Sequence, residues 1–190
     1  MSQNTDDIRI DNARPLITPW VLADQLPGGA TAKATVSSSR RSIEQILAGN
    51  DPRLVVIAGP CSVHDPVALL DFAHQFQAAC EPLADTLLPV LRVYFEKPRT
   101  IVGWKGLIND PDLDGSFHIN KGLHLARKVL LDVAELGLPA ASEFLDNTFG
   151  QYYADLVSFG AIGARTVESQ IHRELASGLS MPVGFKNGTT

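Results

Sequence analysis

Residues 54–80, LVVIAGPCSVHDPVALLDFAHQFQAAC, decide the fold class of this chain. The first five residues are apolar and rich in β-branched side chains, and the run is too short for a helix, which is typical of a buried parallel strand. Asp65 and Pro66 then form a helix start, with the aspartate as N-cap and the proline at the first helical position. The apolar residues that follow recur at helical spacing: Leu69, Phe72, Ala73, Phe76 and Ala79. The stretch therefore predicts a strand followed by an amphipathic helix.

The same alternation continues along the chain. Further strands are predicted at residues 88–95, 139–144, 161–165 and 181–185, and helices at 120–137, 151–158 and 166–178, the last capped by Thr166. Five strands separated by helices predict a parallel sheet with right-handed crossovers. An open doubly wound sheet is complete with five strands, whereas a (β/α)₈ barrel needs about 250 residues. Length alone favours the open sheet, and the residues at the strand ends favour the barrel.

The N-terminal part differs from this pattern. Its isolated apolar residues predict one short helix, capped by Thr18 with Pro19 in the first turn, and then a break at residues 27–29. A second short helix is predicted at residues 43–47, closed by Gly49. We therefore expect an N-terminal extension at residues 1–45 and the β/α unit at residues 46–190.

Composition excludes several classes of protein. The chain has 190 residues, 45% of them hydrophobic and 19% charged, with a net charge of −5. These values exclude wholesale disorder and argue against a nucleic-acid coat. No apolar run approaches the roughly 18 residues of a membrane span, and the N-terminus lacks the pattern of a secretory signal. Two cysteines make no disulfide framework, so we expect a reduced, cytoplasmic protein.

A charged or metal-competent side chain follows every predicted strand, at the edge where α/β folds build their active sites. Burial of a charge needs a compensating partner, so this recurrence points to a site. Six of these side chains are cationic against the two carboxylates Glu96 and Glu143, which predicts an anionic ligand, with arginine suited to phosphate or carboxylate. The six cations are Arg92, Lys97, Arg99, Lys105, Arg165 and Lys186.

Several of these residues also have plainer interpretations. Cys61 and His64 have a metal-like spacing, but two residues do not close a metal site, and a lone cysteine is more often a small buried side chain. Glu143 is either an acid catalyst or the counter-ion of the neighbouring cations. Trp104 is expected to anchor its polar loop by packing. No phosphate-binding glycine motif follows a strand, so the sequence gives no support for nucleotide binding by that route.

Four segments together resemble 3-deoxy-D-arabino-heptulosonate 7-phosphate (DAHP) synthase, in the branch regulated by aromatic amino acids. They are GPCS at residues 59–62, RVYFEKPRTIVGWKG at 92–106, AIGARTVESQ at 161–170 and PVGFKNG at 182–188. The similarity extends over residues 40–189. It implies a (β/α)₈ TIM barrel with an N-terminal extension used in oligomerisation and feedback control, here truncated after about the fifth strand.

The resemblance also implies a reaction, the first step of the shikimate pathway. Phosphoenolpyruvate condenses with erythrose 4-phosphate to give DAHP and phosphate, with the help of a divalent metal ion such as Mn, Fe, Co or Zn. The family forms dimers or tetramers and takes Phe, Tyr or Trp as effector, here expected near residues 146–151 and 175–180 and the extension. The sequence does not identify which of the three amino acids is the effector, although Gly150 and Gln151 weakly favour Trp.

Site residues follow from the same resemblance. Arg92, Lys97, Arg165 and Lys186 are the expected catalytic residues, and Cys61 is the expected metal ligand. Phosphoenolpyruvate is expected to contact Arg92, Lys105, Glu143, Gly163, Ala164, Arg165 and Lys186. Erythrose 4-phosphate is expected to contact Lys97, Pro98, Arg99 and Thr100.

The sequence departs from the family pattern in ways that keep other interpretations open. The family's remaining metal ligands lie on later strands, Val167 replaces a common threonine, and the chain ends in Thr189 and Thr190 where the family continues Thr-Asp-Gly. We therefore expect an incomplete copy that is unstable or self-associating and inactive unless a second polypeptide completes the barrel. The alternative is a non-catalytic remnant that binds phosphoenolpyruvate or a full-length partner. The related 3-deoxy-octulosonate 8-phosphate synthase is disfavoured by residues 97–106 and by the extension.

Overall fold

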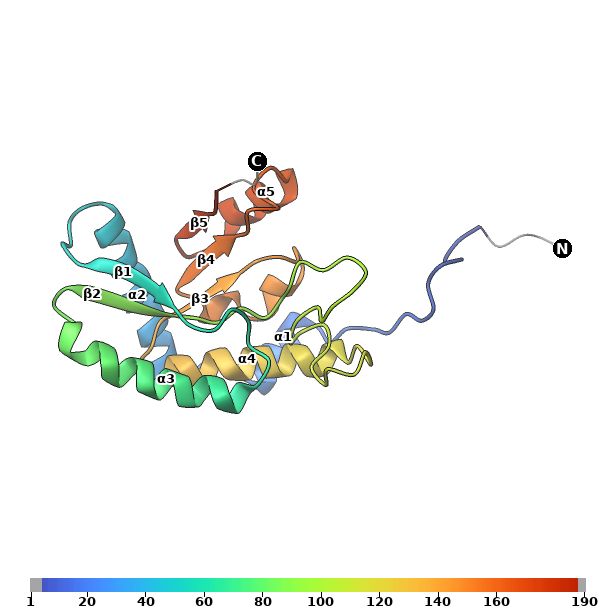
Figure 1. The fold of residues 1–190 in the computed structure, drawn as a ribbon, viewed down its shortest axis with the longest axis horizontal. Helices are drawn as coiled ribbons and strands as arrows, with labels where there is room; N and C mark the ends of the chain where they lie inside the picture. Colours follow the sequence, from blue (N-terminus) through green and yellow to red (C-terminus); the bar gives the residue numbers. More distant parts are fainter. Residues whose placement is uncertain (1–4, 188–190) are drawn as a thin grey trace.

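The computed structural model describes residues 5–187, which contain one parallel sheet with its strands in sequence order (Figure 1). The strands are β1 (Leu54–Ala58), β2 (Leu87–Arg92), β3 (Ala140–Glu143), β4 (Phe159–Ile162) and β5 (Val183–Phe185). A doubly wound sheet reverses its strand order part-way, whereas a barrel adds each strand on the same side. The order β1-β2-β3-β4-β5 therefore excludes the open doubly wound sheet and confirms a curled partial barrel.

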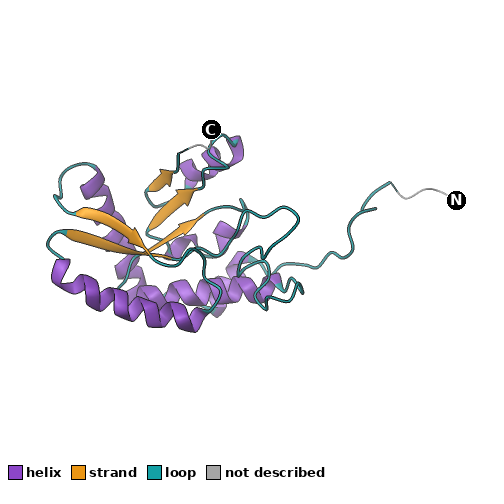
Figure 2. Ribbon diagram, in the orientation of Figure 1, coloured by secondary structure: helices purple, strands orange, loops and turns teal. Residues whose placement is uncertain are grey.

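Helices pack around this sheet (Figure 2). They are α1 (Pro19–Gln25), α2 (Ala30–Leu47), α3 (Pro66–Cys80), α4 (Ile119–Glu135) and α5 (Gln170–Gly178), with the 3₁₀ helices η1 (Glu81–Leu83), η2 (Phe149–Tyr152) and η3 (Ala154–Leu156). The predicted caps of α1 and α3 are confirmed, since Thr18 accepts from the Val21 N–H and Asp65 from the Val67 and Ala68 N–H groups. None of the helices within residues 5–187 is long and apolar enough to cross a membrane.

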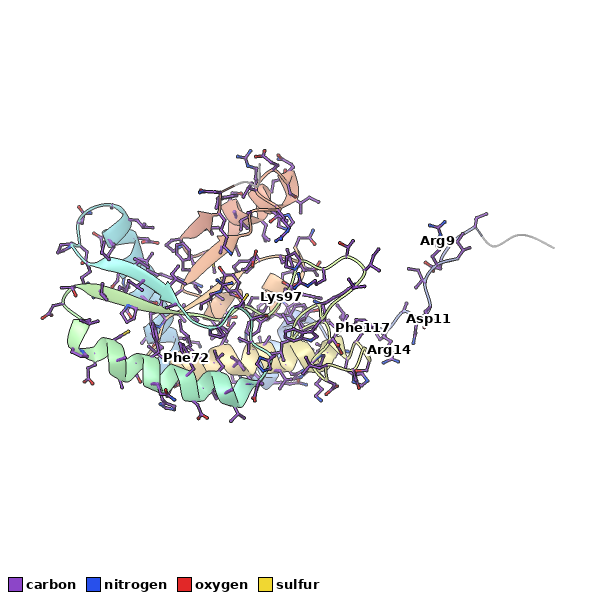
Figure 3. The ribbon with its side chains drawn as sticks, in the orientation of Figure 1. Arg9, Asp11, Arg14, Phe72, Lys97 and Phe117 are labelled. Carbon is purple, nitrogen blue, oxygen red and sulfur yellow. The ribbon has the colours of Figure 1, made fainter. Side chains whose placement is uncertain are left out.

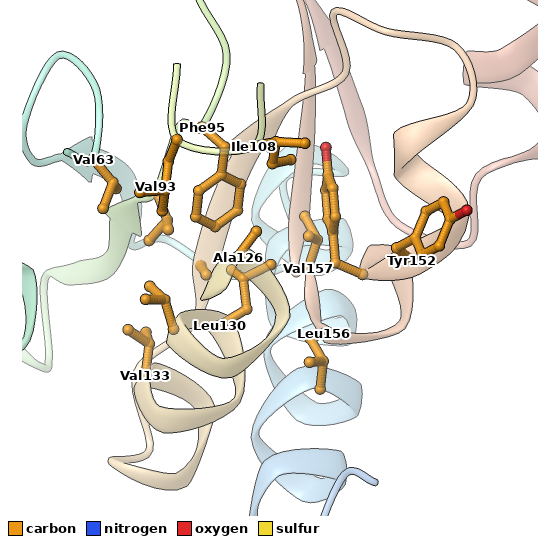
Figure 4. Close-up of a cluster of buried hydrophobic side chains, with 14 of the residues drawn as sticks. Val63, Val93, Phe95, Ile108, Ala126, Leu130, Val133, Tyr152, Leu156 and Val157 are labelled. Carbon is orange, nitrogen blue, oxygen red and sulfur yellow. The ribbon is translucent and has the colours of Figure 1, made fainter. Parts of the chain in front are cut away.

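The alternation of side chains along β2 separates two faces. Leu91, and beyond the strand Val93 and Phe95, belong to the main hydrophobic core together with residues of α3 and α4. Figure 4 shows Val93 and Phe95 beside Ala126, Leu130 and Val133 of α4. Val90 belongs instead to a smaller cluster with Ile43 and Ala141 on the inner face. Because side chains alternate between faces in an extended strand, the even-numbered residues from Val90 onward face the inside of the barrel.

Helix α2 closes the amino-terminal end of that inner face. Ile43 is completely buried in the inner cluster, and the Arg40 guanidinium donates to the carbonyls of Ala154 and Val157 at 2.7–2.9 Å. The helix predicted at residues 43–47 is present and ends at Leu47 as predicted, but it is the last part of α2, which begins at Ala30. The buried residues Ala32, Val36, Ser39 and Ile43 do recur at helical spacing, but serine and threonine residues between them mask the stripe.

Two further elements differ from the prediction. The helix expected at residues 151–158 is replaced by η2 and η3, because Tyr153 between them has φ −148° and interrupts helical geometry. Helix α5 starts after Ser169, and Thr166 does not cap it, because its hydroxyl donates to the Gly163 carbonyl at 3.1 Å. Strand β4 begins at Phe159, two residues before the predicted start.

Strands β1 and β5 are the edges of the described sheet, and each pairs with one neighbour. Apolar side chains on them are exposed, including Leu54 at 66%, Ile57 at 38% and Phe185 at 46%. An uncovered edge with apolar side chains is a surface on which further strands can pair. The structure therefore consists of a closed centre with two open flanks.

Candidate functional site

The charged residues after the strands meet at the carboxyl edge of the inner face. Arg92 and Glu143 end β2 and β3, Lys186 directly follows β5, and Cys61 lies in the turn after β1. Lys97 lies on the loop beyond β2, near the ends of the strands (Figure 3). Gly59 allows that turn to pass close to β2, because it has φ +153° and a Cβ there would lie 2.7 Å from the Arg92 carbonyl oxygen.

Direct contacts join five of the predicted site residues. The Lys97 Nζ donates to the Cys61 Sγ at 2.9 Å, and the Arg92 guanidinium donates to the Cys61 carbonyl at 3.2 Å. The Lys186 Nζ lies 3.9 Å from a Glu143 carboxylate oxygen. Three cations, a thiol and a carboxylate thus share one region, which we call the cationic cluster: Cys61, Arg92, Lys97, Glu143 and Lys186.

Tyr94, for which the sequence predicted no role, connects the two halves of the cationic cluster. Its ring is 5% exposed, with the Arg92 guanidinium carbon 4.1 Å and the Lys186 Nζ 4.9 Å from the ring centroid. The signal was present in the sequence, since residues two apart in an extended segment point to the same face. Arg92 and Tyr94 therefore had to face the same side.

The electrostatics of the site follow from these contacts. The hydrogen bond from Lys97 lowers the pKa of the Cys61 thiol, and the charges of Lys97, Arg92 and Lys186 act in the same direction. Burial raises the pKa of Tyr94, and the nearby Glu143 carboxylate adds to that effect. The site thus makes the Cys61 thiol more acidic and the Tyr94 phenol less acidic than usual.

A hairpin-like loop carries the residues predicted for the second substrate. Glu96 and Gly106 form an antiparallel bridge, and the Lys97 N–H donates to the Lys105 carbonyl at 2.9 Å. Trp104 packs against the main core and donates its ring N–H to the Asp110 carbonyl at 2.7 Å, which confirms its predicted anchoring role. The base of the loop is thereby fixed against the core.

Not all predicted residues join the cationic cluster. Pro98 and Lys105 are half-buried, and the side chains of Arg99, Thr100 and Arg165 are exposed with no hydrogen bond or ion pair to the cluster within residues 5–187. Gly163 lies directly against it, because a Cβ there would be 2.0 Å from a Glu143 carboxylate oxygen, and Ala164 follows.

Glu96 adds a buried carboxyl behind the loop. It is 6% exposed and accepts a hydrogen bond from the Asp146 N–H at 3.3 Å. Burial raises its pKa from 4.5 to about 7, with the neighbouring carboxylates Asp146 and Glu143 adding to the rise. The base of the loop therefore contains a group that titrates near neutral pH.

A metal centre is not formed by the described residues alone. Residues 5–187 contain no group of three or more His, Cys, Asp or Glu side chains with the geometry to hold a metal ion. Cys61 is a single thiol, and Lys97 already donates to it. One soft ligand does not define a divalent metal site, so we assign no chemical step to a metal.

Comparison with known proteins decides the family. The model of the DAHP synthetase I family matches residues 30–190. The chain belongs to this family. The Phe-sensitive phospho-2-dehydro-3-deoxyheptonate aldolase of Escherichia coli (strain K12) is 59% identical over 189 residues, and the Trp-sensitive one of Salmonella typhimurium is 58% identical over 185 residues. A solved phospho-2-dehydro-3-deoxyheptonate aldolase from Francisella tularensis has a TM-score of 0.92 at 53% identity and covers 95% of this chain.

The coverage is one-sided. The chain is matched over 97–100% of its length by the two curated relatives, yet it spans 53–54% of theirs. It likewise covers 53% of the solved Francisella tularensis chain. The chain thus spans about half the length of the DAHP synthases that it resembles, and its open edges β1 and β5 lie where a barrel would continue.

Proposed function

We propose that this chain is the phosphoenolpyruvate-binding half of a cytoplasmic DAHP synthase, which condenses phosphoenolpyruvate with erythrose 4-phosphate. The observation that carries the proposal is the convergence of Arg92, Lys97 and Lys186 on one edge of a partial barrel. Phosphoenolpyruvate presents a carboxylate and a phosphate, and each suits an arginine or lysine contact. The family match supports this reaction over the related octulosonate synthase.

The proposed roles combine the contacts of the cationic cluster with the roles that the family resemblance implies. Arg92 and Lys186 bind the carboxylate and phosphate, with Lys105, Arg165 and the backbone of Gly163 and Ala164 completing the contacts around Glu143. Lys97 lies between the substrates and assists proton transfer, while Pro98, Arg99 and Thr100 receive the phosphate of erythrose 4-phosphate. Cys61 would supply one thiolate to a divalent metal.

The reaction would proceed by attack of the phosphoenolpyruvate methylene carbon on the sugar aldehyde. Water adds at the enol-ether carbon, and phosphate leaves after cleavage of its bond to that carbon. The cations of the cluster stabilise the charge that shifts onto the carboxylate and the phosphate during these steps.

A second candidate is a non-catalytic chain that binds phosphoenolpyruvate or a full-length partner. The open edges of β1 and β5, with Leu54 and Phe185 exposed, favour it. A sheet with two unpaired edges gains stability from any partner that covers them. The two candidates predict the same ligand and differ in turnover.

Isothermal titration of the 190-residue chain tests the ligand. We expect phosphoenolpyruvate to bind more tightly than pyruvate or inorganic phosphate, because each of these lacks one anionic group. Lys186→Met should weaken binding about tenfold or more, whereas Lys128→Met, which removes an exposed lysine paired with Asp132 on α4, should leave it unchanged. Equal binding by both variants would contradict the proposal.

Turnover separates the two candidates. The chain is mixed with a polypeptide that corresponds to the other half of the Phe-sensitive relative, and the release of phosphate is measured with both substrates and each candidate metal. Metal-dependent turnover in the mixture supports the enzyme, and binding without turnover supports the non-catalytic chain.

We further propose that residues 1–45 act as an extension for dimer or tetramer formation and for control by an aromatic amino acid. The segment that carries Arg9, Asp11 and Arg14 extends away from the body (Figure 3). Ile17, which follows this segment, is held close to the expected effector region at residues 146–151, because the Tyr152 hydroxyl donates to the Ile17 carbonyl at 2.6 Å. Deleting residues 1–14 should lower the assembly size measured by light scattering.

A further inference from the structure

Tyr94 contacts two cations of the cluster through its ring. We infer that Tyr94 is a positioning residue, which holds Arg92 and Lys186 in place for an anionic ligand without neutralising their charge. The inference rests on the proposed function, because it concerns how the same site binds phosphoenolpyruvate.

The physical argument starts from the repulsion between two cations in one site. Glu143 lies 3.9 Å from Lys186 and already offsets part of its charge. A carboxylate between Arg92 and Lys186 would hold both cations, but it would also cancel the remaining charge that a ligand needs. An aromatic face attracts a cation through its quadrupole and carries no net charge. The distances of 4.1 Å to Arg92 and 4.9 Å to Lys186 lie within the range of this interaction.

Arg92 depends strongly on the ring. Its Nε is buried and is one of three buried side-chain polar atoms without a hydrogen-bond partner within residues 5–187. Its remaining polar contact is the 3.2 Å hydrogen bond to the Cys61 carbonyl. No carboxylate pairs with its guanidinium among the described residues. The guanidinium is therefore oriented mainly by the ring and remains available to a ligand anion.

The ring is itself held in a fixed position. Its side chain is almost completely buried, and the Tyr94 carbonyl accepts hydrogen bonds from the Val63 N–H at 2.8 Å and the Ser62 hydroxyl at 3.2 Å. These bonds join Tyr94 to the turn that carries Cys61. Burial also raises the pKa of its hydroxyl, which keeps the phenol neutral. Tyr94 thus fixes two cations relative to the β1 turn.

The test compares the phosphoenolpyruvate affinity of a variant that keeps an aromatic ring at position 94 with that of a variant that has an aliphatic side chain there. Tyr94→Phe keeps the ring and should bind phosphoenolpyruvate within about twofold of the unmodified chain. Tyr94→Leu keeps an apolar side chain without the quadrupole, and should weaken binding about tenfold in isothermal titration. An equal loss in both variants, or no loss in Tyr94→Leu, would overturn the inference.

A double-variant cycle excludes a role as simple core filling. If the ring acts by positioning Lys186, then Tyr94→Leu should cost clearly less affinity in a Lys186→Met background than in the unmodified chain. The same fold-loss in both backgrounds would show that the ring acts independently of this cation and would contradict the inference.

Failure of the proposed function is visible separately, as absent phosphoenolpyruvate binding by the unmodified chain. In that event the contact is tested by thermal unfolding of Tyr94→Leu, Arg92→Met and the double variant. If the ring holds the guanidinium, the decrease in melting temperature of the double variant should be about 2 °C smaller than the sum of the decreases in the two single variants. Additive shifts would overturn the inference.

Discussion

Strands β2 and β1 lie side by side in the same sheet, yet their surroundings differ completely. Leu91 of β2 is fully buried between the sheet and helices α3 and α4, while Leu54 of β1 is 66% exposed. Both strands are short apolar runs, and their sequences do not reveal this difference. The position in the sheet decides it, because β2 has neighbours on both edges and β1 has a neighbour on one. The closed centre can be stable within this chain, whereas the flanks need further contacts.

The largest expected effect compares the same truncation in the two strands. Leu91→Ala should lower the free energy of unfolding by about 3 to 4 kcal/mol, because it leaves a cavity in the core. Leu54→Ala should cost less than about 1 kcal/mol, because its side chain is already in water. Urea denaturation measures both. A similar cost at the two positions would show that the β1 edge is covered in solution, as in a self-associated chain.

The next prediction uses pH to probe the base of the loop in the closed centre. The unfolded chain loses the Glu96 proton near pH 4.5, while the folded chain retains it up to about pH 7. Stability therefore falls as the pH rises through this window, and the loss is complete above it. Glu96→Gln removes the titration and keeps an acceptor for the Asp146 N–H, so its stability advantage should grow to about 3 kcal/mol by pH 8.

Unfolding of both proteins by urea between pH 5 and pH 8 measures this difference. Glu168→Gln, an amide substitution at an exposed glutamate, is the control. A stability difference that stays constant across the pH range would show that Glu96 is not buried as a neutral acid.

Two adjacent residues of α4 sharpen the comparison between buried and exposed charge. Arg127 is buried, pairs with Asp155 through two hydrogen bonds and donates to the carbonyls of Leu26 and Tyr152. Arg127→Met leaves these carbonyls unpaired and should cost about 2 to 3 kcal/mol. Lys128→Met breaks an exposed pair with Asp132 and should cost less than about 0.5 kcal/mol. If thermal unfolding shows the same loss of stability for both variants, Arg127 does not lie on a buried face of α4.

The smallest expected effect is on the reactivity of Cys61 in the cationic cluster, and it does not change the fold. Lys97→Met removes the hydrogen bond to the Cys61 sulfur, so the pKa of the thiol should rise towards its ordinary value. Alkylation by iodoacetamide, followed against pH in a Cys80→Ser background, measures this change. An unchanged pH profile would mean that Lys97 does not contact the thiol in solution.

Much of the architecture could be predicted from local sequence. The strand at residues 54–58 and the caps Thr18 and Asp65 depend on short-range patterns, and all three are confirmed. The start of helix α2 and the turns η2 and η3 were missed or wrongly assigned, because their backbone is fixed by distant partners. Ser39, for example, donates to the Ser158 hydroxyl 119 residues away. Phe72 fits the helical stripe of α3 but is 39% exposed, and its ring stacks on Phe76 of the same helix.

The sequence by itself determined that charged side chains lie near the carboxyl ends of the strands, although β2 and β4 end at Arg92 and Ile162, before the predicted ends at residues 95 and 165. The family motifs also gave the expected role of each charge. The tertiary structure alone decided that the strands follow one another in order, that Tyr94 lies against Arg92 and Lys186, and that Arg99 and Arg165 stay outside the cationic cluster. The physical reason is that the approximate position of a strand follows from local preference, whereas strand order and side-chain contacts depend on packing between residues far apart in the chain.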